Sequence, residues 1–222
     1  MIVSITNKQR RQAVISSIIA VVLAILIKFN VILPSVLDNS IHSWVANIQT
    51  GYGDVVMAIA TFLGNPVVDV VYILILAGVL IIAKLHIPAI WTIATIISGD
   101  AVIAIIRVIV NRTRPVGHLL ADSSSSFPST HVFGLFIVIF IMAILVTPNI
   151  NSTYTQVIIN WITITIGLMT ILSRIYFNAH FFSDTIAAVL FAYSWVVLCA
   201  SLYPKLAIFL QHNITLFRHD EI

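Results

Sequence analysis

Charged residues are scarce in this sequence. Asp, Glu, Lys and Arg make up only 9% of its 222 residues, whereas 60% of the residues are hydrophobic. So few polar side chains cannot cover the surface of a water-soluble globular protein. The sequence therefore predicts an integral membrane protein whose partners are the bilayer and molecules within it.

Cysteine is almost absent as well. A single cysteine, Cys199, excludes an intrachain disulfide and gives no cysteine cluster for zinc. The formal net charge is +3, but the basic residues are scattered and form no basic face, so nucleic acid is not an expected partner. The first apolar run lacks a cleavage site of the usual form and is expected to be a membrane span rather than a signal peptide.

Six apolar runs are long enough to cross a bilayer, since a helical crossing needs roughly 20 apolar residues. The segment 34–64, between the first two runs, mixes aromatic and polar residues and suits short helices along the interface. We expect a single all-α polytopic domain over residues 1–222. The predicted spans are residues 13–31, 66–85, 88–110, 132–147, 157–172 and 185–203.

Orientation follows from the basic residues. Six spans place both termini on one side, and that side carries Lys8, Arg10 and Arg11. The opposite side carries a similar number of basic residues, but most of them belong to or lie between the motifs described below, where function would demand them. We therefore expect both termini to be cytoplasmic and the motifs to face outside, in what we expect to be a bacterial cell membrane.

The first motif is Arg107-x6-Arg114-Pro115. Two arginines seven residues apart share one face of a helix if the helix persists that far. Guanidinium groups grip phosphate oxygens in bidentate fashion. The alternative is that outer arginines only reach lipid headgroups, and this is the preferred reading for Arg112. A charged residue as deep in the apolar run as Arg107 usually has a functional role.

The second motif is Pro128-Ser129-Thr130-His131, at the start of the fourth span. Ser129 or Thr130 is expected to cap that helix, whose free N–H groups favour an anion. An imidazole at His131, beside a bound anion, suits a general acid. A capped helix with a chance histidine is the alternative.

The third motif is Ser173-Arg174-x5-His180-x3-Asp184. His180 and Asp184 are four residues apart, which places the carboxylate one helical turn from the ring. A carboxylate that accepts one ring N–H leaves the other nitrogen free to attack. The same pair suits a zinc or manganese ion, but a cluster of arginines disfavours a metal there.

Together the three motifs resemble the signatures of the type-2 phosphatidic acid phosphatase superfamily. These membrane lipid phosphatases share a site with acid phosphatases and vanadium haloperoxidases. The usual pattern is Lys-x6-Arg-Pro, Pro-Ser-Gly-His and Ser-Arg-x5-His-x3-Asp, and this chain matches it in order over residues 107–184. Two positions depart from it, because Arg107 replaces lysine and Thr130 replaces glycine.

The resemblance implies a role for each motif residue. His180 is the expected nucleophile, forming a phosphohistidine, with Asp184 orienting it. His131 is expected to protonate the leaving oxygen and then activate water. Ser173 is expected to help position Arg174, and no metal or cofactor is implied. The expected phosphate-binding residues are Arg107, Arg114, Ser129, Thr130 and Arg174.

The expected activity is hydrolysis of a lipid phosphate or diphosphate, with undecaprenyl diphosphate, phosphatidylglycerophosphate and phosphatidate as candidate substrates. A phosphotransferase that uses the same intermediate is one alternative. A transporter or channel is another, because Asp69, Asp100 and Arg107 are ionisable residues in spans. It is disfavoured because the polar residues gather at one surface. For Asp69, a supporting role near the site and a simple helix-start carboxylate are equally good readings. The oligomeric state is not readable from the sequence.

Overall fold

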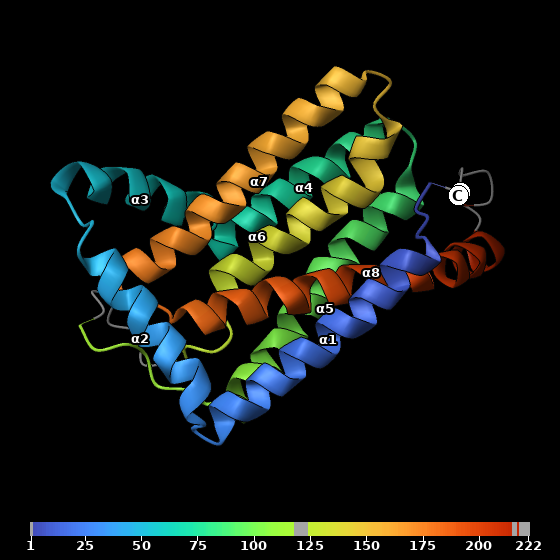
Figure 1. The fold of residues 1–222 in the computed structure, drawn as a ribbon. Coiled ribbons are helices and arrows are strands. Elements are labelled where there is room, and N and C mark those ends of the chain that lie inside the picture. Colours follow the sequence, from blue (N-terminus) through green and yellow to red (C-terminus); the bar gives the residue numbers. More distant parts are fainter. Residues whose placement is uncertain (1, 118–123, 215–216, 218–222) are drawn as a thin grey trace.

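The computed structural model describes residues 2–117, 124–214 and 217, and within them the chain forms helices and no strand (Figure 1). The helix α6 continues through a π-helical turn, Met142–Val146, and a 3₁₀ turn, Thr147–Asn149. The α-helices are α1 (Asn7–Lys28), α2 (Ile32–Ala46), α3 (Gly51–Leu63), α4 (Pro66–Ile82), α5 (His86–Val110), α6 (Thr130–Ile141), α7 (Thr153–Tyr176) and α8 (Phe182–Asn213).

Five helical segments are each long and apolar enough to cross a membrane: α1, α5, α6 with its continuation, α7 and α8. The pair α3 and α4, bent by 50° at the break between them, qualifies together as a sixth. The helices α2 and α3 occupy the segment in which short helices were predicted. The structure thus confirms an all-α, polytopic membrane protein.

The ends of the first and last spans differ most from the predicted ones. The first span begins at Asn7 rather than at residue 13, because Thr6 and Gln9 form a capping box in which each side chain bonds the other's backbone N–H. The last span runs to Asn213 rather than to residue 203, and Pro204 lies inside the helix. Apolar run length therefore located both spans but not the additional helical turns that extend them.

The interior is held by apolar packing and by hydrogen bonds between spans. The indole of Trp91 on α5 donates to the carbonyl of Cys199 on α8 (3.1 Å), and the indole of Trp195 on α8 donates to the carbonyl of Thr95 on α5 (3.0 Å). Buried indole N–H groups need such partners, and here they connect the two helices in both directions. Figure 1 shows α1 running beside α8, its most extensive neighbour.

The alternating direction of the spans decides where the motifs meet. The C-terminal ends of α5 and α7 and the N-terminal ends of α6 and α8 lie at one end of the bundle (Figure 1). The start of α1 and the end of α8 lie at the opposite end, where Val3 and Phe217 belong to one apolar cluster with Ala207. The motifs of the sequence are therefore brought to one surface.

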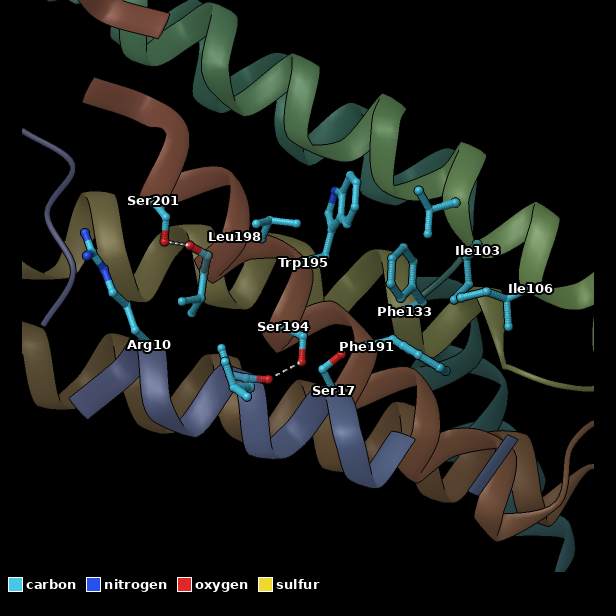
Figure 2. A pocket seen from close by; sticks show the side chains of 14 residues that line it. Arg10, Ser17, Ile103, Ile106, Phe133, Phe191, Ser194, Trp195, Leu198 and Ser201 are labelled. Carbon is cyan, nitrogen blue, oxygen red and sulfur yellow. Dashed lines mark hydrogen bonds between the residues drawn. The ribbon is translucent and has the colours of Figure 1, made fainter. Parts of the chain in front are cut away.

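A separate cavity of about 470 Å³ lies between α1, α5 and α8. Figure 2 shows Arg10 at one end of it and Ile106 at the other, with Trp195 between them. Most of its wall is apolar, and the hydroxyl of Ser194 is already bonded to the carbonyls of Ala13 and Leu190. None of the motif residues lines this cavity, so it is distinct from the site described next.

Candidate active site

Arg107 and Arg114 meet, but not by sharing a helix. The helix α5 ends at Val110, and Asn111 takes the left-handed conformation (φ 50°), which turns the chain out of the helix. Arg114 therefore lies in the loop, and the condition for a common helical face, a helix that persists to Arg114, is not met. The two guanidinium groups converge instead on the hydroxyl of Ser124, at 2.7 Å from Arg107 and 3.2 Å from Arg114.

Backbone carbonyls fix the direction of both guanidinium groups. Arg107 donates to the carbonyl of Pro128 (2.9 Å), in the second motif. Arg114 donates to the carbonyl of Ala179 (3.0 Å), next to His180 of the third motif. The two arginines of the first motif thus connect to the other two motifs.

The second motif begins α6. Ser129 occupies the N-cap position, but its side chain makes no capping hydrogen bond, contrary to the expected role. Its hydroxyl is buried and has no hydrogen-bond partner among the described residues. A buried hydroxyl next to the first N–H groups of a helix suits an anion's oxygen atoms. Thr130 is the first residue of α6, and His131 follows it.

The third motif places a buried arginine beside a buried histidine. Arg174 lies in the last turn of α7, and its carbonyl accepts the N–H groups of Ala179 (3.0 Å) and His180 (3.1 Å). This turn carries His180 back toward Arg174. The hydroxyl of Ser173 donates to the carbonyl of Thr170 (2.8 Å) and accepts from Thr61 (3.0 Å), so its bonds fasten α7 to α3 and do not involve Arg174.

The ring of His180 is oriented by a main-chain carbonyl. Its Nδ1 lies 2.7 Å from the carbonyl oxygen of Ser126. Because a carbonyl only accepts, Nδ1 carries the proton, and the lone pair is on Nε2. Oδ2 of Asp184 is 3.8 Å from Nδ1, which is longer than a hydrogen bond, and it accepts instead from the N–H of Phe181 (2.9 Å). The ring's hydrogen bond is thus made to Ser126, while Asp184 stays within ion-pair distance of it.

The surroundings of His180 favour the neutral ring. Burial lowers the pKa of His180 below its ordinary value; Asp184 opposes this shift, while Arg174 and Arg114 add to it. A neutral imidazole at neutral pH has the unprotonated nitrogen that nucleophilic attack requires.

Arg112 is a site residue that sequence reasoning missed. Its guanidinium bonds both Asp184 (2.5 Å) and Asp38 of α2 (2.7 Å), two carboxylates with no exposed side-chain surface. Asp38 also accepts the N–H (2.9 Å) and the hydroxyl (2.7 Å) of Ser183. Arg112 was expected to face lipid headgroups. The available signal was Asp38 itself, since a carboxylate in an apolar segment needs a cation.

The charged residues of the three motifs lie close enough to influence one another electrostatically. His131 is within electrostatic range of Arg174, His180, Arg114 and Arg107. A cavity of about 770 Å³ adjoins them and has Arg107, Ser124 and Thr130 in its wall. Several guanidinium groups and two imidazoles gathered at one end of the bundle can bind a phosphate, attack it and protonate the group that leaves.

The family model of the PAP2 superfamily matches residues 66–208. The chain belongs to this superfamily. The match runs from α4 into α8 and contains all three motifs. Membership makes this protein a phosphatase of the PAP2 type, an enzyme that acts on lipid phosphates.

A solved structure shares the fold. It is the crystal structure of a transmembrane PAP2-type phosphatidylglycerolphosphate phosphatase from Bacillus subtilis. The likeness has a TM-score of 0.74 at 20% sequence identity and covers 87% of this chain and 96% of that chain. A comparison with curated protein sequences found no match.

Proposed function

We propose that this protein removes the terminal phosphate from a membrane lipid phosphate or diphosphate through a phosphohistidine at His180. The observation that carries the proposal is the bond from Nδ1 of His180 to the carbonyl of Ser126, which leaves Nε2 to attack. The ring is buried and lies within electrostatic range of Arg174 and Arg114, whose charges would hold the phosphoryl oxygens.

In the proposed reaction, Nε2 of His180 forms a bond to phosphorus as the bond from phosphorus to the lipid oxygen breaks. His131 gives its proton to that oxygen, and the lipid alcohol or lipid monophosphate leaves. His131 then takes a proton from water, which attacks the phosphohistidine and releases inorganic phosphate. Arg107, Ser129 and Thr130 complete the set of groups that contact the phosphoryl oxygens. No metal or cofactor takes part in this scheme.

The lipid part of the substrate would enter through the cavity beside Arg107 and Thr130, whose wall includes Ile103 and Val108. Undecaprenyl diphosphate, phosphatidylglycerophosphate and phosphatidate each combine a lipid part with a terminal phosphate, and all three are candidate substrates. The name of the Bacillus subtilis protein favours phosphatidylglycerophosphate as the first substrate to test. We further propose that residues 1–222 act as one domain, with the site facing outside a bacterial cell membrane and both termini in the cytoplasm.

The test is phosphate release by the purified protein in detergent, with these three lipids offered separately and excess chelator present. We expect turnover of at least one lipid and inhibition by vanadate, which mimics the transferring phosphoryl group. His180→Ala is the matched inactive control. Loss of turnover on chelation, restored by one divalent ion, would contradict the mechanism. Product formed only when an acceptor alcohol is added would instead identify a phosphotransferase.

A further inference from the structure

Asp69 of α4 is a buried carboxyl group that the scheme above does not use. It is 1% exposed, and neither of its side-chain oxygens has a hydrogen-bond partner among the described residues. A buried carboxyl group without a partner destabilises a fold, so its presence requires an explanation. The remaining options are a polar group close by on a neighbouring helix or a bridging water molecule.

The side chain of Asp69 lies directly against α6. A Cβ atom added to Gly134 would lie 2.5 Å from Oδ2 of Asp69, a distance at which the two atoms would clash. A larger residue at this point of α6 would displace the carboxyl group from its position. The close approach fixes which turn of α6 the carboxyl group meets.

That turn begins at His131. Residues three apart on a helix lie on nearly the same face and about 4.5 Å apart along its axis, so Gly134 and His131 face the same side of α6. The Nδ1 atom of His131 is buried and, like the oxygens of Asp69, has no partner among the described residues. An acceptor and a donor, each without a partner, thus lie on adjacent turns of the same interface.

We propose that Asp69 is the positioning residue of His131: its carboxyl group accepts the Nδ1 proton of His131 through a bridging water molecule. The inference rests on the proposed function, in which Nε2 of His131 carries the proton to the leaving oxygen. With Nδ1 held in this way, Nε2 faces the phosphate. The arrangement is similar to that of His180 and Ser126, because in both cases Nδ1 donates to an acceptor of the protein side and Nε2 is left for the substrate.

Charge supports the same assignment. A proton on Nε2 gives His131 a positive charge in a site that already contains Arg107, Arg114 and Arg174. Asp69 lies on α4, whereas Arg107 lies on α5, Arg174 on α7 and Arg114 in the loop after α5. In its ionised form, Asp69 offsets the charge of the imidazolium ion while the substrate binds.

The test compares Asp69→Asn with the wild type in the first turnover, measured by rapid quench on a lipid phosphate and on an activated aryl phosphate. We expect roughly a tenfold slower reaction with the lipid, part of the general-acid contribution of about 10²- to 10⁴-fold. The aryl phosphate should react at nearly the wild-type rate, since its good leaving group needs little protonation. In a His131→Ala background, Asp69→Asn should cause no further loss with the lipid.

A second readout does not depend on activity. In protein labelled with ¹⁵N-histidine, Asp69→Asn should change the ring-nitrogen signals of His131 and leave those of His180 unchanged. Asp54→Asn, which alters a carboxyl group bonded to the hydroxyl of Tyr176 instead, is the matched control. Equal losses with both substrates, additive losses in the double variant or unchanged His131 signals would overturn the assignment. A wild type that hydrolyses no lipid phosphate would refute the proposed function, while the nitrogen signals would still test Asp69.

Discussion

Arg112 joins two buried carboxylates that come from different helices. Asp184 opens α8, next to the proposed nucleophile, and Asp38 lies on α2. Neither carboxylate has exposed side-chain surface, so each needs the positive guanidinium group to compensate its negative charge. Its planar fork can serve both at once, whereas the ammonium group of lysine is a single point donor.

We therefore expect Arg112→Ala to lower the free energy of unfolding by about 3 to 5 kcal/mol, because it leaves two buried charges uncompensated. The activity of the surviving folded protein should fall as well, since Asp184 loses the contact that holds it. Thermal unfolding and lipid phosphate turnover, both in detergent, measure the two effects.

The control is Lys8→Ala, which removes a basic residue at the other end of the bundle. It should leave the free energy of unfolding and the turnover of lipid phosphate nearly unchanged. Arg112→Lys should recover only part of the stability. Wild-type stability in Arg112→Ala would show that this network does not hold α2 and α8 together.

At the scale of helices, the sequence predicted most of the fold. Long apolar runs and polar breaks located the spans because lipid leaves few alternatives for a backbone. The meeting of the three motifs at one end also followed, since successive helices alternate in direction. The predicted ends were less accurate: the capping box at Thr6 and the extension of α8 through Pro204 depend on local contacts rather than on hydropathy.

The contacts between loops were not predictable in the same way. The left-handed turn at Asn111 takes Arg114 off α5, and only then can it reach Ser124 and Ala179. Ser126, which orients His180, lies outside all three motifs and acts through its backbone carbonyl. Any residue type can supply a carbonyl, so side-chain patterns carry no signal for such a partner.

At the scale of the whole molecule, the site and the ends of the described chain occupy opposite ends of the bundle. We therefore expect the protein to act on only one leaflet. The basic residues Lys8, Arg10 and Arg11, at the end away from the site, favour the cytoplasm for that end. The outer leaflet is then the expected source of substrate.

Cysteine labelling in intact cells tests this orientation. In a background with Cys199→Ser, a cysteine at Val116 should react with a membrane-impermeant reagent, because this residue is 94% exposed at the site end. A cysteine at Asn151, an exposed residue in the turn before α7, should react only after the membrane is opened. The reverse pattern would place the site in the cytoplasm.

The most direct test of the central claim is to trap the phosphoenzyme by rapid quench with a labelled aryl phosphate. If His180 attacks and His131 transfers the proton, His180→Ala should form no phosphohistidine. His131→Ala should still form it with this good leaving group and should lose it slowly, because water activation is impaired. Phosphohistidine in His180→Ala, or its complete absence from both the wild type and His131→Ala, would contradict the account.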